Sequence, residues 1–159
     1  MPSEEDGELV EGDEVELIQC IYTSAAVRPF DSAELETLLV AARAHNEQAG
    51  LTGMLLYSEG SFFQVIEGPA DLVDSLYERI ENDPRHTLMT KLIRETIKER
   101  SFEDWTMGFC RASREDIARI VGMNDFLRIR HSGSEELAGR ARKLLAAFRD
   151  GRWRKRISA

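Results

Sequence analysis

The sequence predicts an α+β domain whose elements follow the ferredoxin-like order β-α-β-β-α-β-β, with further helices at the C-terminus. Two observations predict this class. Short apolar runs with β-branched members alternate with longer segments whose apolar residues recur at helical spacing. Two of these runs, 51–57 and 61–67, are separated only by Ser58-Glu59-Gly60, a spacing typical of a β-hairpin. We therefore expect two helices on one face of the sheet, with the later helices covering the other face.

The first predicted strand, Leu17–Ser24, leads into a helix whose two ends are marked in the sequence. Asp31 and Glu34 have the spacing of a capping box, which places the start of the helix at Asp31. Gly50 is typical of a helix C-terminus and ends it. The inner face carries apolar residues at i, i+3, i+4 and i+7, namely Leu35, Leu38, Leu39 and Ala42.

A second helix is predicted after the hairpin. Pro69 suits its first turn, and the sequence Asn82-Asp83-Pro84 stops it. Two further strands are expected after this helix, at 88–97 and 106–110. The predicted inner face of the second helix consists of Leu72, Val73, Leu76 and Ile80.

Beyond the last strand we expect a helical extension. Ser113 and Asp116 have the spacing to cap a short helix, and an amphipathic helix follows at 135–148. The apolar stripe of the last helix covers the exposed sheet face or joins a second chain; it consists of Leu137, Ala141, Leu144, Leu145 and Phe148. The predicted organisation is an acidic disordered segment 1–14, a ligand-binding domain 15–111, a helical extension 112–150 and a basic tail 151–159.

Composition limits the classes of function. The chain has 159 residues, of which 42% are hydrophobic and 31% charged, and this suits one globular domain. Its formal net charge of −8 argues against a nucleic-acid-binding domain. No apolar run approaches the roughly 20 residues that cross a bilayer, and the acidic N-terminus is not a secretory signal. Cys20 and Cys110 form no disulfide framework and no Cys/His cluster has metal-ligand spacing, so we expect buried thiols in a cytoplasmic protein without a metal.

Polar side chains on apolar faces indicate a ligand site. Asn46 lies 11 positions after Leu35, close to a whole number of helical turns, and therefore on the buried stripe of the first helix. Gln64 alternates with large apolar residues in its strand, and Tyr22 lies within the first strand. Each has an ordinary alternative, because an Asn near a helix end is often a cap and a strand tyrosine often only packs. An unsatisfied buried amide costs about 1–3 kcal/mol, so two buried amides and a phenol together favour a flat polar ligand.

A series of short motifs goes further than composition or spacing. In chain order they are Tyr22-Thr23-Ser24, Ala44-His45-Asn46, Leu51-Thr52-Gly53, Phe62-Phe63-Gln64, Glu67-Gly68, Asp83-Pro84-Arg85-His86 and Trp105-Thr106-Met107. The ordered series, without an internal gap from about Leu17 to Cys110, resembles the BLUF family, the blue-light sensors that use FAD. The domain is similar to proteobacterial BLUF domains of antirepressor type, and the chain resembles short BLUF proteins that carry no large output domain.

The resemblance implies a photoactive group beneath an isoalloxazine ring that lies between the two helices. Carried over by motif, Tyr22 is the electron and proton donor, and Gln64 stands between its hydroxyl and the N5/O4 edge of the flavin. Ser24 and Trp105 adjust the hydrogen bonds of Gln64, and Met107 packs beside it. Trp105 and Met107 alternate in the last predicted strand, and we expect them to share a face with Phe109.

The same resemblance implies the residues that bind the cofactor. Asn46 hydrogen-bonds the pyrimidine side of the ring, and Arg85 approaches its other carbonyl. His45 and His86 flank the ring or the ribityl chain, and Asp83 contacts the polar tail. FAD is the expected cofactor, with FMN or riboflavin as alternatives.

A protein of this kind is a switch rather than an enzyme, because no substrate is consumed. The resemblance implies a homodimer and an unidentified downstream protein partner, and neither a membrane nor a nucleic acid is expected as partner. Three other classes are alternatives. An acid-anhydride hydrolase would need a phosphate-cradling loop, and a flavin oxidoreductase would be expected to carry a nicotinamide-binding fingerprint. The sequence shows neither motif. A light-insensitive interaction module would lose the set of Tyr22, Gln64 and Asn46, which is present.

Overall fold

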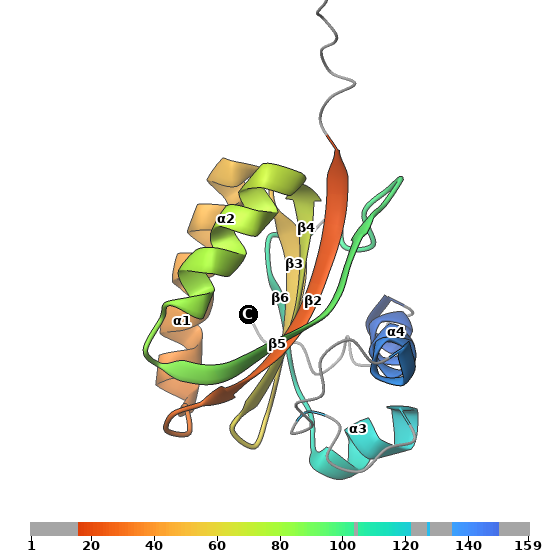
Figure 1. The fold of residues 1–159 in the computed structure, drawn as a ribbon. Helices are drawn as coiled ribbons and strands as arrows, with labels where there is room; N and C mark the ends of the chain where they lie inside the picture. The colour runs from red at the N-terminus through yellow and green to blue at the C-terminus, as the bar shows by residue number, and fades with distance from the viewer. Residues whose placement is uncertain (1–15, 104, 122–126, 128–134, 150–159) are drawn as a thin grey trace, which may run out of the picture.

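The computed structural model describes residues 16–103, 105–121, 127 and 135–149, and the statements below concern these residues. Five strands form one sheet in the order β5-β2-β4-β3-β6 (Figure 1). They are β2 (Leu17–Ala26), β3 (Thr52–Ser58), β4 (Ser61–Pro69), β5 (His86–Thr96) and β6 (Gly108–Arg111). The strand β2 runs antiparallel to β4 and β5, and β3 runs antiparallel to β4 and parallel to β6.

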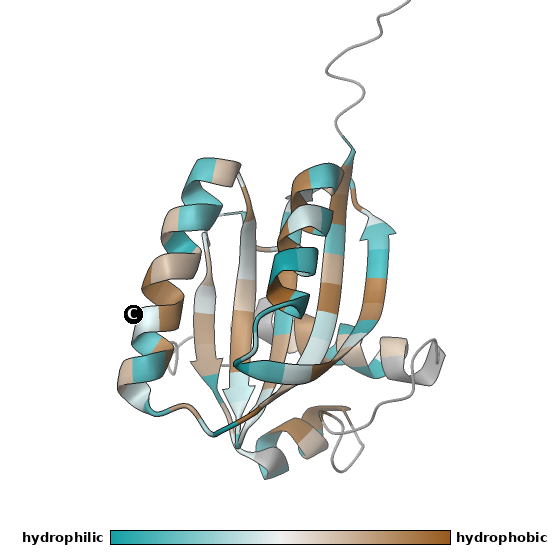
Figure 2. Cartoon of the chain, turned by 60° about the vertical axis from the view of Figure 1, so that its left-hand side comes forward, coloured by the Kyte–Doolittle hydropathy of each residue, from teal (hydrophilic) through white to brown (hydrophobic). Residues whose placement is uncertain are grey.

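Helices cover both faces of this sheet. One face carries α1 (Ser32–Ala49) and α2 (Ala70–Glu81), and the other carries α3 (Arg114–Val121) and α4 (Glu135–Arg149) (Figure 1). Apolar residues run along the strands, and α2 turns largely hydrophilic residues outward (Figure 2). The predicted α+β ferredoxin-like class and the division of the helices between the two faces are confirmed.

The ends of α1 follow the sequence signals. The Asp31 side chain accepts from the Glu34 backbone N–H at 2.8 Å, and the Glu34 side chain accepts from the Asp31 N–H at 2.9 Å, which completes the predicted capping box. Gly50 ends the helix in the left-handed region with φ 73°, where its lack of a Cβ removes the strain. Within the helix Asn46 is buried, as its spacing predicts.

The start and inner face of α2 differ from the prediction. Pro69 is still extended, with φ −59° and ψ 136°, and serves as the N-cap rather than as a residue of the first turn. Val73 and Tyr77 are buried against the sheet, whereas Leu72 is 38% exposed. The assignment of Leu72 to the inner face is therefore wrong, because the buried stripe runs through Val73 and Tyr77, one position further along the helix.

The last strand is shorter than predicted. Because β6 begins at Gly108, Trp105 and Met107 precede it and do not follow its alternation. Met107 is buried beneath α1 together with Phe109. Trp105 instead packs beside Phe102, with ring centroids 5.3 Å apart, in the cluster on the α3 and α4 face. The prediction that Trp105 shares a face with Met107 and Phe109 is therefore wrong.

The extension beyond β6 covers the second face of the sheet. The Ser113 hydroxyl accepts from the Asp116 backbone N–H at 3.1 Å and caps α3 as predicted. In α4 the predicted stripe is buried at Ala141, Leu144 and Leu145, which pack in the same cluster as Ile93 and Ile117. The side chains of Leu137 and Phe148, the acidic segment 1–14 and the basic tail 151–159 lie outside the described residues.

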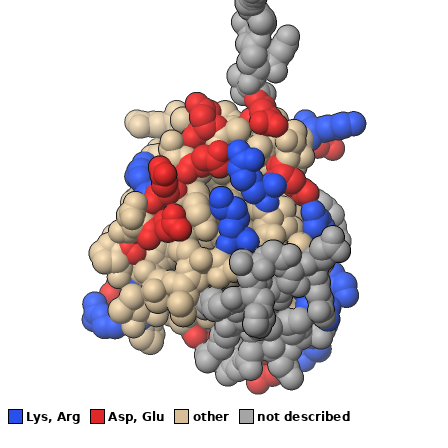
Figure 3. Space-filling view, in the orientation of Figure 1, with Lys and Arg blue, Asp and Glu red and all other residues tan. Residues whose placement is uncertain are grey.

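The described surface is unevenly charged. Acidic side chains gather over α2, and basic side chains lie directly beside them (Figure 3). Arg94 of β5 pairs with Asp74 of α2 at 2.8 Å, and the Lys91 ammonium lies 4.4 Å from the Tyr77 ring centroid. None of the described helices combines the length and the apolar character that crossing a membrane requires. Both Cys20 and Cys110 lie among the described residues and are buried, as predicted.

Candidate functional site

A cavity of about 210 Å³ lies between α1 and α2, above the centre of the sheet. Its walls are apolar and its floor is polar, and the two helix-side core clusters meet at its border. The walls come from Leu38, Ala41 and Ala42 of α1 and from Leu76 and Ile80 of α2. A cavity with apolar walls and polar groups on its floor suits an aromatic ring system that carries polar atoms at its edge.

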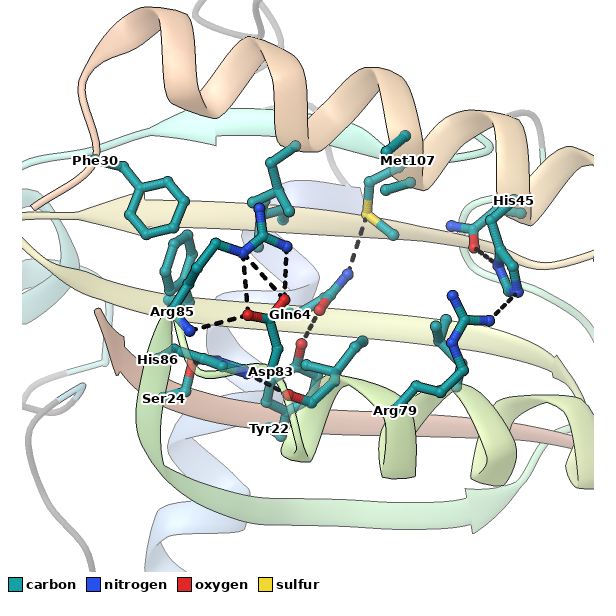
Figure 4. Close-up of a pocket in the computed structure, with 18 residues that line it drawn as sticks. Tyr22, Ser24, Phe30, His45, Gln64, Arg79, Asp83, Arg85, His86 and Met107 are labelled. Carbon is teal, nitrogen blue, oxygen red and sulfur yellow. Dashed lines mark hydrogen bonds and ion pairs between the residues drawn. The ribbon is translucent and has the colours of Figure 1, made fainter. Parts of the chain in front are cut away.

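The floor of the cavity holds a chain of three side chains. Tyr22 and Gln64 face each other across the β2–β4 pair, where direct cross-strand neighbours project from the same face. The Tyr22 hydroxyl donates to Gln64 Oε1, and Gln64 Nε2 donates to Met107 Sδ at 3.6 Å (Figure 4). Sulfur is a weak acceptor, and among the described residues it is the only one recorded for this amide nitrogen, which leaves an N–H for a ligand.

Burial keeps the Tyr22 phenol neutral. Tyr22 is 2% exposed, and this burial raises its pKa well above the ordinary value, with Cys20 and Tyr77 adding smaller effects. The Tyr77 ring meets Tyr22 edge-on, with centroids 5.4 Å apart, and burial raises the pKa of Tyr77 to about 12. The hydroxyl of Tyr22 therefore acts as a donor at neutral pH, which agrees with its bond to Gln64.

One end of the cavity is closed by a relay of hydrogen bonds from α2 to the segment before β6. Arg79 Nη1 donates to His45 Nε2 at 3.0 Å, so His45 carries its proton on Nδ1 and donates it to Asn46 Oδ1 at 3.2 Å. Asn46 Nδ2 then donates to the Thr106 carbonyl at 2.7 Å. One turn earlier in α1, Arg43 Nε donates to the Met107 carbonyl at 2.8 Å. The helix α1 therefore holds two consecutive carbonyls of this segment.

The other end of the cavity is polar and partly open. Arg85 forms a fork with Asp83, with an Nη2–Oδ2 distance of 2.5 Å, and this hydrogen bonding lowers the pKa of Asp83. His86 Nε2 donates to the Ile80 carbonyl at 2.5 Å. In the neutral ring His86 Nδ1 then accepts from the buried Ser24 hydroxyl at 2.9 Å.

The structure brings nearly all of the predicted site residues to this one cavity. Those that line it are Tyr22, Ser24, His45, Asn46, Gln64, Asp83, Arg85, His86 and Met107. Trp105 is the exception among the described site residues, because it lies against the opposite face of the sheet. A Cβ on Gly108 would lie 2.5 Å from the Trp105 ring, so the absence of a side chain there makes room for it.

Sequence reasoning missed several residues around the cavity, of which four make polar or aromatic contacts. Arg79, Phe30 and Arg43 contact the cavity or the segment before β6, and Tyr77 packs on Tyr22. Arg79 and Arg43 are single basic residues on helices. Because most such residues are simply exposed to solvent, the sequence carries no signal that these two contact the site. Phe30 directly precedes the capping Asp31, and this position was the one available signal that it packs back onto the helix.

The donor set fits a flavin. An apolar cavity with amides at its edge matches an aromatic ring system that carries alternating donors and acceptors along its rim. Gln64 offers an N–H, Asn46 Oδ1 keeps a lone pair beyond its bond to His45, and Arg85 lies at the mouth. The fold and the site together define a domain that holds a flat, amide-recognised cofactor of this kind.

Comparison with known proteins agrees. The family "Sensors of blue-light using FAD" (BLUF) matches residues 17–108. The beta subunit of the photoactivated adenylate cyclase of Euglena gracilis is 37% identical over 107 residues, which are 67% of this chain and 12% of that protein. The dark-state structure of BlrB, a BLUF protein, has a TM-score of 0.64 and 33% identity, and the match covers 83% of this chain and 97% of that one. The ground-state structure of BlsA has a TM-score of 0.68 and 28% identity, and the match covers 81% of this chain and 87% of that one.

The chain belongs to the BLUF family, the blue-light sensors that use FAD. The match covers more than half of its residues and includes the whole cavity. The chain spans 12% of the length of this Euglena subunit. The similarity therefore concerns the sensor domain and not the remainder of that protein.

Proposed function

We propose that this protein is a blue-light photoreceptor in which a flavin lies between α1 and α2, above Tyr22 and Gln64. The observation that carries the proposal is the bonded chain of Tyr22, Gln64 and Met107 beneath an apolar cavity between the two helices. The chain then functions as a sensor domain, 15–111, with the helical extension 112–150 as its cover, and has no catalytic activity of its own.

The residues at the cavity edges hold the cofactor in this proposal. Asn46 and Gln64 bind the polar edge of the ring, and Arg85 binds a carbonyl at the mouth. His45, His86 and Asp83 surround the ring and its polar chain. A second hollow, of about 460 Å³, shares Phe30 and Arg85 with the cavity and is also lined by Arg28. This adjoining space supports FAD over the shorter FMN or riboflavin by its room rather than by its charge, because Asp31 and Glu34 line it together with Arg28 and Arg85.

The photochemistry uses the special pairing of a phenol with an amide. The bound flavin supplies the absorption of blue light and an excited state that accepts an electron. Tyr22 is placed to release an electron together with its hydroxyl proton, and Gln64 Oε1 is the atom that takes up this proton. When both return to Tyr22, the amide is left rotated or tautomerised, with its donor and acceptor exchanged.

The rearranged amide no longer offers Met107 the same N–H. Because the Met107 and Thr106 carbonyls are bound by α1, a change at Gln64 reaches the segment before β6 and the helix beside it. Ser24 and Trp105 adjust the response from the two faces of the sheet. We propose that a downstream protein, as yet unidentified, reads this change in a cytoplasmic homodimer; in the Euglena relative the named output is an adenylate cyclase.

Illumination of the purified full chain tests the proposal. A photoreceptor gives a small reversible red shift of the flavin absorption band under blue light. Bleaching of the band would instead indicate an oxidoreductase, and a folded protein that binds no flavin would indicate an interaction module. Acid release and chromatography of the chromophore then distinguish FAD from FMN and riboflavin.

A further inference from the structure

We infer that Glu67 is a positioning residue that holds Met107 in the place from which it meets Gln64. This inference rests on the proposed function. Glu67 lies in β4, three residues after Gln64, and therefore on the opposite face of the sheet. Its side chain is fully buried, with 0% exposure. A buried carboxylate is costly unless it is fully hydrogen-bonded, and the cofactor cavity does not use this one.

Four donors surround the carboxylate. Oε2 accepts from Gln19 Nε2 at 2.9 Å and from the Ser101 backbone N–H at 2.7 Å. Oε1 accepts from the Phe102 backbone N–H at 3.0 Å and from the Thr52 hydroxyl at 3.2 Å. Two of the four donors are thus main-chain groups of the connection between β5 and β6. Charge-assisted bonds of this kind are among the stronger ones in proteins, so the connection is held firmly at this point.

The same connection is held again before it enters β6. We call Ser101–Phe102 together with Trp105–Met107 the strap. Glu67 binds the first end of the strap, and the Trp105 carbonyl accepts from the Gly53 backbone N–H of β3 at 2.9 Å. A Cβ at Gly53 would lie 2.0 Å from a carbonyl oxygen of β4, so only glycine permits this close packing. The helix α1 binds the last two carbonyls of the strap.

One strand therefore controls both ends of the strap. On the cavity face of β4, Gln64 bonds the Met107 side chain, and on the other face Glu67 bonds the Ser101 and Phe102 main chain. With Glu67 in place the strap has little freedom, and Met107 stays against Gln64. Loss of an acceptor at Glu67 frees the first end of the strap and weakens the contact at the other end, which alters the return to the dark state.

Glu67→Gln tests this in the full-length, flavin-loaded protein. The variant keeps the shape of the side chain but replaces one acceptor oxygen with an NH₂ group. Whichever way the amide is turned, this NH₂ group faces a backbone N–H, of Ser101 or of Phe102, that has lost its acceptor. We expect amide hydrogen exchange at Ser101 and Phe102 to accelerate about tenfold or more. We expect the dark-state Met107 methyl resonance to shift, and the recovery rate after blue light to change by about threefold or more. Glu103→Gln is the matched control, because it changes an exposed carboxylate in the same connection. We expect it to leave the amide exchange, the Met107 resonance and the recovery rate unchanged.

If Glu67→Gln does not fold, Gln19→Met removes a single donor to Oε2 and is expected to give the same changes at smaller size. A Met107 resonance and a recovery rate equal to wild type, with only a lower melting temperature, would reduce Glu67 to a structural residue and overturn the inference. The resonance is measured in the dark. A wild-type protein without any red shift would therefore contradict the proposed function, while a shifted Met107 resonance in Glu67→Gln would still support the positioning role.

Discussion

Replacing Asn46 with alanine perturbs the cavity and the strap at once. Asn46 is 1% exposed, and its Nδ2 donates to the Thr106 carbonyl at 2.7 Å. Alanine leaves the carbonyl of the half-buried Thr106 without this donor and the His45 Nδ1–H without its acceptor, and an unsatisfied polar group away from water costs about 1–3 kcal/mol. We therefore expect the unfolding free energy of the flavin-free protein to fall by about 2 kcal/mol. For a domain of this size the melting temperature then falls by about 4–8 °C.

The same substitution weakens flavin binding. Loss of one ring hydrogen bond, worth about 0.5–1.5 kcal/mol net, raises the flavin Kd by about 2- to 13-fold. Urea unfolding of the flavin-free protein and a fluorescence titration with FAD measure the two effects separately. Gln48→Ala removes an exposed amide from the same helix and serves as the control, with both quantities expected near wild type. Asn46→Ala values that match those of Gln48→Ala would refute the assigned role of Asn46.

Three further predictions concern the rest of the chain. Hydrogen bonding to Arg85 lowers the pKa of Asp83 in the folded protein. The stability that ionised Asp83 contributes is therefore fully present above the pKa of Asp83 in the unfolded chain, and it is lost as the pH falls through the pKa of Asp83 in the folded protein. Asp83→Asn should therefore lower the unfolding free energy at pH 7 by less than about 1 kcal/mol and leave it unchanged in strong acid. Burial raises the pKa of Cys20 to about 11, so its thiol stays protonated and unreactive at pH 8 in the folded protein. In a Cys110→Ala variant, a thiol reagent should therefore label Cys20 only at the rate of local unfolding. Rapid labelling of the native protein would contradict this. A chain ending at Arg111 bares the sheet face that α3 and α4 cover, and light scattering should show that it associates beyond the mass of the full chain.

Local patterns were sufficient to predict much of the fold and the floor of the site. The period of two places Tyr22 and Gln64 on an inner strand face, and the helical period buries Asn46. The capping box at Asp31 fixes the start of α1. These features depend on residues within one element, so the sequence carries them directly.

Contacts between distant segments were not predictable in the same way. Trp105 and Met107 are two residues apart but occupy opposite faces, because the main chain there is held by β3 and α1 before β6 begins. The role of Glu67 depends on two backbone amides more than 30 residues away. Leu88 adopts φ 57° beside an irregularity in the β2–β5 pairing, and nothing in its local sequence marks that bend.

The central claim is tested most directly by the blue-light-minus-dark absorption spectrum. It is recorded for wild type and for the Tyr22→Phe and Gln64→Leu variants, each with its flavin retained. We predict a reversible red shift in wild type and none in either variant, because one lacks the phenol that gives up the electron and proton and the other lacks the amide that exchanges donor and acceptor. Tyr77→Phe, which removes the hydroxyl of the ring packed on Tyr22, should keep the shift. A shifted state formed with ordinary yield in Tyr22→Phe or Gln64→Leu would contradict the account.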